Sequence, residues 1–129
     1  MFSVKKVLFS VFVLFGVITV AQADILAAGI AYGGATQTLA TCSLFNAGPG
    51  PVTITSNVII REPNVPLVLT FDTCGVLAAG ASCAVGLPIV FNLGHSCRMV
   101  VSPSGADVRG VLQIRESQFG RVLHHLELR

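Results

Sequence analysis

Short runs in which apolar and polar residues alternate fill the chain after residue 23, and clusters of Gly, Pro and Asn separate them. In the clearest run, 108–116, Val108, Leu112 and Ile114 fall on one face and mostly polar residues on the other. Alternation with a period of two is typical of a half-buried β-strand. No segment sustains a period of 3.6, so the pattern predicts an all-β protein.

The runs predict seven or eight strands with turn signals between them. Pro66 places its strand at the edge of a sheet or at a strand start, because proline cannot donate a ladder hydrogen bond. This number and spacing of strands favours an immunoglobulin-like antiparallel β-sandwich. No shift in composition divides residues 24–129, which we expect to form one domain. The expected strands are 25–32, 38–45, 52–60, 65–71, 82–91, 96–101, 108–116 and 121–128.

The first 23 residues have a different pattern. Two lysines precede an apolar run at 7–20, and the small-x-small sequence Ala21-Gln22-Ala23 ends it. This order is typical of a helical secretory signal peptide, here 1–23, cleaved between Ala23 and Asp24. A transmembrane anchor is the alternative, but a span needs about 20 apolar residues. We therefore expect export to the periplasm or the cell exterior, with no stable membrane span after cleavage.

Charge and composition add one restriction. Hydrophobic residues make up 53% of the chain and charged residues 11%, and both lysines lie within 1–23. The remainder holds six arginines and six acidic residues, so its net charge is zero. Nucleic acid is then not an expected partner, because such binding needs a basic face. An unidentified protein or envelope component is the expected partner. We expect a solvated, mutually paired charged face on the last hairpin, formed by Arg109, Arg115, Arg121, Arg129, Glu116 and Glu127.

Four cysteines, Cys42, Cys74, Cys83 and Cys97, lie in the expected mature part. An even number of cysteines in an exported protein predicts two disulfides, and four cysteines allow three connectivities. We favour Cys74–Cys83, which closes a short glycine-containing segment, and Cys42–Cys97, which joins two strands distant in sequence. By loop entropy the two bonds would contribute roughly 2.5–3 and about 4 kcal/mol respectively.

The sequence contains no motif that identifies a catalytic residue, a cofactor-binding residue or a metal ligand. The cysteine spacings do not match a zinc site. His95, Cys97 and Met99 share one face of a strand, but a blue-copper site needs a second histidine and a different ligand order. There is no G-x-S-x-G motif, and His95, His124 and His125 lack catalytic sequence context. We expect His124 on the apolar face of its strand, as a core or edge histidine.

Several segments together resemble a family of small exported bacterial proteins of unknown function, across most of the chain after residue 23. The asparagine-glycine turn and the following L-x-x-G-x-S segment are also similar to immunoglobulin-like domains of the major-sperm-protein and ASPM/SPD-2/Hydin type. The resemblance implies a β-sandwich, supports the Cys74–Cys83 pairing, and implies no catalytic residue and no cofactor. The matching segments are 42–48, 74–83, 96–98, 108–115, 122–123 and 128–129.

These observations favour a non-enzymatic structural or interaction module. One alternative is a fimbrial or adhesin-type subunit that assembles by strand donation, since the first strand, 25–32, is apolar on both faces. Another is a periplasmic metal-binding or hydrolytic protein, whose catalytic residues would have to assemble in space.

Overall fold

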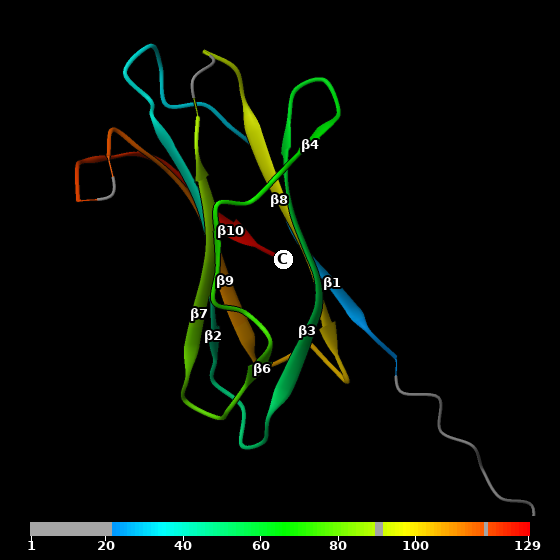
Figure 1. Cartoon of the computed structure of the whole chain (residues 1–129). Helices are drawn as coiled ribbons and strands as arrows, with labels where there is room; N and C mark the ends of the chain where they lie inside the picture. Colours follow the sequence, from blue (N-terminus) through cyan, green and yellow to red (C-terminus); the bar gives the residue numbers. More distant parts are fainter. Residues whose placement is uncertain (1–21, 90–91, 118) are drawn as a thin grey trace, which may run out of the picture.

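Two antiparallel β-sheets pack against each other in this protein (Figure 1). The computed structural model describes residues 22–89, 92–117 and 119–129, and it contains no helix in these ranges. The predicted signal peptide therefore lies almost wholly outside the described residues. The predicted all-β architecture is confirmed. The strands are β1 (Asp24–Ala31), β2 (Leu39–Asn46), β3 (Val52–Arg61), β4 (Val65–Leu67), β5 (Phe71–Asp72), β6 (Val76–Leu77), β7 (Ser82–Pro88), β8 (His95–Ser102), β9 (Val108–Arg115) and β10 (Val122–Leu128).

The first sheet has the order β1-β8-β3-β4, with β6 also paired to β3, and the second has the order β10-β9-β2-β7-β5. Every pairing is antiparallel. The first sheet thus pairs β1 with β8, which is more than 60 residues later in the chain, while the last two strands belong to the second sheet. The predicted hairpin between the last two strands is present as β9 and β10.

The segment 65–77 accounts for the difference between the seven or eight expected strands and the ten found in the described residues. It divides into three short strands that alternate between the sheets: β4 on β3, β5 on β7, and β6 back on β3 (Figure 1). Its residues cover parts of the open edges of both sheets, and covered edges are protected from pairing with other chains. Pro66 lies in β4 at an edge of the first sheet, where the sequence placed it.

The core follows from the alternation along the strands. In β2, Ala40, Cys42 and Leu44 are buried, as the pattern predicted, while Phe45 is exposed. Inward-facing residues of the two sheets meet in one apolar cluster, which buries enough surface to hold the sheets together. Its largest fully buried apolar side chains are Leu44, Ile59, Met99, Leu112, Ile114, Val85 and Val101.

Two disulfides brace the sandwich, and they are the two favoured from the sequence. Cys42–Cys97 joins β2 to β8, and thus one sheet to the other, with a Cα–Cα distance of 6.4 Å. Cys74–Cys83 ties the segment between β5 and β6 to β7, with a Cα–Cα distance of 5.0 Å.

The end of the chain also connects the two sheets. The backbone N–H of Ala27 in β1 donates to the carbonyl of Arg129 at 2.9 Å, and the Arg129 N–H donates back to Ala27 at 3.0 Å. Because Arg129 directly follows β10, this pair joins the edge strands of the two sheets on that side.

Asn46 organises the turn after β2. Its side chain is completely buried, and Nδ2 donates to the carbonyls of Gly50 at 2.8 Å and Leu77 at 3.0 Å. Its Oδ1 accepts from the Gly48 N–H at 3.0 Å. One side chain thus holds the glycine- and proline-rich turn against β6.

Candidate functional site

The outward face of the second sheet carries the groove that we take as the candidate site. Strand pairing sets its side chains in cross-strand rows, because residues opposite one another point to the same face. From β7 across β2 and β9 to β10, the rows are Ser82, Phe45 and Arg109; then Ala84, Ser43, Val111 and Glu127; then Gly86, Thr41, Gln113 and His125.

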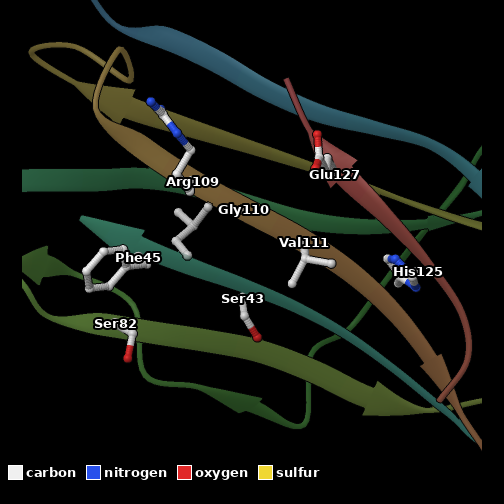
Figure 2. Close-up of a pocket in the computed structure, with 9 residues that line it drawn as sticks. Ser43, Phe45, Ser82, Arg109, Gly110, Val111, His125 and Glu127 are labelled. Atoms are coloured by element: carbon white, nitrogen blue, oxygen red, sulfur yellow. The ribbon is translucent and has the colours of Figure 1, made fainter. Parts of the chain in front are cut away.

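An open groove of about 400 Å³ lies on these rows (Figure 2). Ser43 and Val111 lie in its middle, Phe45 and Arg109 on one side, and His125 and Glu127 along β10. The groove is low in its middle because Ser43 and Val111 are short. The longer side chains of Phe45, Arg109, His125 and Glu127 surround these two residues.

Phe45 is the main apolar feature of this surface. It is 45% exposed although it belongs to a strand whose other face is fully buried. In the cross-strand register it lies between Ser82 on β7 and Arg109 on β9. The signal that marks it is an aromatic residue on the otherwise polar face of an alternating strand. The alternation in 38–45 predicts this face of the strand, but it does not single out Phe45 as a binding residue.

The charged side chains of the groove are exposed to solvent, and each interacts with groups close to it in sequence. Nη1 of Arg109 donates to the carbonyls of Ala106 at 2.8 Å and Val108 at 3.2 Å, which holds the guanidinium near the start of β9. Glu127 pairs with Arg129 at 3.3 Å, and both side chains are mostly exposed. Such pairs cost little to separate, because solvent screens them. Charges of both signs are therefore accessible to a bound partner.

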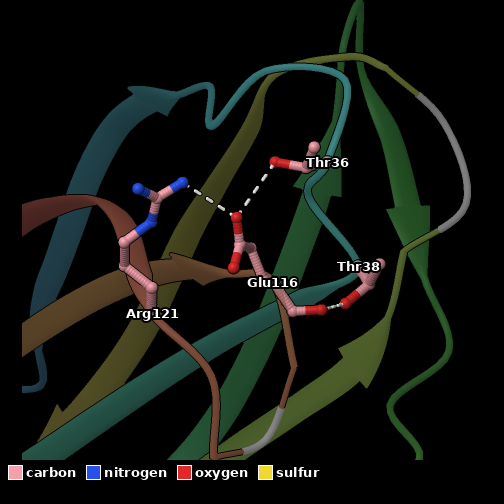
Figure 3. Close-up of polar contacts among 4 residues, drawn as sticks. All are labelled: Thr36, Thr38, Glu116 and Arg121. Atoms are coloured by element: carbon pink, nitrogen blue, oxygen red, sulfur yellow. Dashed lines mark hydrogen bonds and ion pairs between the residues drawn. The ribbon is translucent and has the colours of Figure 1, made fainter.

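The hairpin between β9 and β10 holds a second polar cluster (Figure 3). Oε1 of Glu116 accepts from Nη2 of Arg121 at 2.9 Å and from the Thr36 hydroxyl at 3.5 Å. The Thr38 hydroxyl donates to the Glu116 carbonyl. In contrast, Arg115 donates to Oε1 of Gln113, at 3.1 Å from Nε and 2.8 Å from Nη2. The arginines are thus engaged with separate local groups on this solvated face.

The residues of the expected cleavage site lie at the start of the sandwich. Ala23 is exposed and Asp24 begins β1. The Asp24 carboxylate accepts from the Gly105 N–H at 2.7 Å and the Ser104 hydroxyl at 3.1 Å, which ties β1 to the loop after β8. Cleavage between Ala23 and Asp24 stays a prediction.

The set of ligands considered for copper lies as expected on one buried face of β8, which carries His95, Cys97 and Met99. The Cys97 sulfur is bonded to Cys42, and all four cysteines are in disulfides, so no thiol is available as a ligand. Within 22–89, 92–117 and 119–129, no three His, Cys, Asp or Glu residues are grouped in a way that could hold a metal ion.

His124 is exposed on the edge strand β10, so of the two expected places, core or edge, the structure shows the edge. It pairs with Ile114 and shares the face of Leu126 and Leu128, which is the apolar face that the alternation predicted. The register shifts between Val122 and His124, so Val122 is the residue that the bulge takes out of this alternation.

Comparison with protein-family models, with curated proteins and with solved structures gives no match to this chain. The described residues also contain no helix long and apolar enough to cross a membrane.

Proposed function

We propose that this protein is an exported, non-enzymatic binding module and that the groove around Phe45 holds a partner protein. The observation that carries the proposal is the 45% exposure of Phe45 in the groove of a regular sheet. Aromatic side chains on rigid elements are typical anchors of protein interfaces, because they bury much area at a small cost in side-chain entropy.

The rest of the groove supports a protein partner. Arginine is enriched at interfaces, and Arg109 follows Phe45 in the same cross-strand row. The hydroxyls of Ser43 and Ser82 offer both donors and acceptors beside the aromatic ring. Glu127 supplies the opposite charge. A partner with a nonpolar group flanked by charges of both signs would fit this surface.

The architecture supports export and an immunoglobulin-like assignment. Two antiparallel sheets joined by a disulfide between β2 and β8 are consistent with that type of sandwich. Two disulfides are also consistent with an oxidising compartment, such as the periplasm or the cell exterior.

The experiment is a pull-down from the native envelope, with the exported protein as bait and Phe45→Ser as the test variant. Loss of an interface anchor costs about 2 kcal/mol or more, which is roughly a 30-fold loss of affinity. Phe119→Ser is the matched control, because Phe119 is 93% exposed and lies outside the groove.

We expect a partner that is enriched with wild type and with Phe119→Ser and that is lost with Phe45→Ser. Circular dichroism would first show that both variants are folded. Absence of any enriched partner would contradict the proposal, and so would equal enrichment by the two variants.

A second candidate function is assembly by exchange of β1. This strand lies at an edge of its sheet, and its register with β8 shifts between Ala28 and Ala31. Ile25 and Ile30 are 52% and 59% exposed. Size-exclusion chromatography tests this function: oligomers that persist on dilution would support it, and a monomer at all concentrations would contradict it.

A further inference from the structure

His95 is a buried histidine at one end of β8, an inner strand of the first sheet. It begins β8 and lies between Ala31 of β1 and Arg61 of β3 in the strand register. Its side chain is 1% exposed, and neither ring nitrogen has a hydrogen-bond partner of normal geometry among the described residues. Every imidazole has polar groups at both nitrogens. Burying them unpaired is already unfavourable, and burying an added positive charge would be more so.

The backbone before His95 is held on two sides. Oε2 of Glu62 accepts from the Gly94 N–H at 3.0 Å, and the Glu62 N–H donates to the Gly94 carbonyl at 3.0 Å. Nε2 of Gln37 donates to the Leu93 carbonyl at 2.7 Å. These bonds fix the backbone that carries the imidazole, so we infer that the imidazole reaches water when the neighbouring strands separate.

The charged groups around the imidazole belong to β3 and the residue that follows it. Burial lowers the pKa of His95, and the Arg61 guanidinium lowers it further. The Leu93 backbone and the Glu62 carboxylate oppose this change and are the weaker influence. On the β1 side the neighbour is Ala31, fully buried and uncharged, and the next residue, Tyr32, donates to Oδ1 of Asn92. The apolar cluster of the sandwich interior completes the surroundings.

We propose that His95 makes this end of the sandwich acid-sensitive, so that protonation of the imidazole drives it into water and releases the end of β1 from β8. The neighbouring geometry favours β1 as the element that moves. It is an edge strand of its own sheet, and its pairing with β8 is interrupted between Ala28 and Ala31. Its two backbone bonds to Arg129 are at Ala27, before this interruption, and leave the Ala31 end without them. In contrast, β3 is paired along the other side of β8 and carries β4 and β6.

The direction of the pH dependence follows from the two protonation states. In an opened state the imidazole is solvated and titrates near its ordinary pKa of about 6.5. Above that pH both states are neutral and opening is independent of pH. Below it, the open state binds a proton that the closed state does not, so the open population rises about tenfold per pH unit. Because the pKa of the enclosed imidazole is lowered by burial, the rise between pH 7.5 and 5.0 is at most about 30-fold.

A first measurement follows the three imidazoles of the wild-type protein by NMR across this pH range. His124 and His125 are exposed and serve as internal references. We expect His95 to remain neutral below the ordinary histidine pKa of about 6.5. Titration of His95 at or above that value would overturn the proposal, and this result does not depend on any variant being folded.

A second measurement uses amide hydrogen exchange, corrected for its intrinsic pH dependence. We expect the opening of β1, read at Ala28, to increase up to about 30-fold from pH 7.5 to 5.0, while Leu112 in β9 stays protected. His95→Leu should abolish the increase, and the exposed control His124→Asn should retain it. An increase that persists in His95→Leu, or that is equal at Leu112, would overturn the proposal.

Discussion

Removal of the Cys42–Cys97 disulfide by the double substitution C42A/C97A is expected to lower the free energy of unfolding by about 4 kcal/mol. The two cysteines are 55 residues apart in sequence. Closing a loop of that length removes chain entropy from the unfolded state equivalent to about 4.2 kcal/mol at 25 °C. Because small domains are stable by only about 5–15 kcal/mol, this is a large share of the total.

The second disulfide supplies a matched comparison within the same protein. Cys74 and Cys83 are 9 residues apart, and the same relation gives about 2.7 kcal/mol for C74A/C83A. Cys42 and Cys97 are 0% and 1% exposed, whereas Cys74 is only partly buried. Truncating the buried pair also leaves a cavity, which adds to its cost. The difference between the two variants should therefore be at least about 1.5 kcal/mol.

Urea denaturation of protein recovered from an oxidising compartment measures both losses. The chain has no tryptophan and one tyrosine, so far-ultraviolet circular dichroism is the suitable probe. The slope of free energy against urea must be compared along with the midpoint, because removing a crosslink exposes more surface in the unfolded chain. A loss from C74A/C83A equal to or larger than that from C42A/C97A would refute the reasoning from loop length and burial.

Three further substitutions test the packing by the same assay. Asn46→Leu should lower the free energy of unfolding by about 3 kcal/mol, since one buried and two part-buried backbone groups lose their partner; a loss below about 1 kcal/mol would contradict this role. Gly86→Ala should cost about 1–3 kcal/mol, because the new Cβ would lie 2.5 Å from the Phe71 ring; unchanged stability would show that the ring moves away freely. Glu116→Gln should cost less than about 1 kcal/mol, because its pair with Arg121 is exposed; a larger loss would mean that the pair is more than a surface contact.

The alternation of apolar and polar residues was sufficient to predict most of the strands. The alternation in 108–116 predicted β9 to within one residue, and the buried positions Leu112 and Ile114 are those expected. The glycines between Cys74 and Cys83 and the apolar strands around Cys42 and Cys97 pointed to the pairing found in the structure. The strands and their buried positions depend on residues close in the chain, so they can be predicted from sequence. The presence of two disulfides follows from the even number of cysteines.

The candidate site could not be predicted from these local patterns. Phe45, Arg109 and Glu127 belong to three strands, and only the register of β2, β9 and β10 shows that they lie on one surface. Register is a non-local property, because it is set by which strands pair and where bulges fall. The exposure of His124 depends on the position of β10 at the edge of its sheet, which is also a non-local property.

The sequence by itself determined most of the strands and the alternating faces of the core, because side-chain alternation is a local consequence of backbone geometry. It favoured the observed disulfide pairing without excluding the other two connectivities. Tertiary structure alone decided the division of 65–77 between the two sheets, since its short strands are stabilised by partners on both. It also decided that His95 is enclosed with no hydrogen-bond partner of normal geometry among the described residues. That state depends on strands β1 and β3, which are far from His95 in the chain and adjacent to it only after folding.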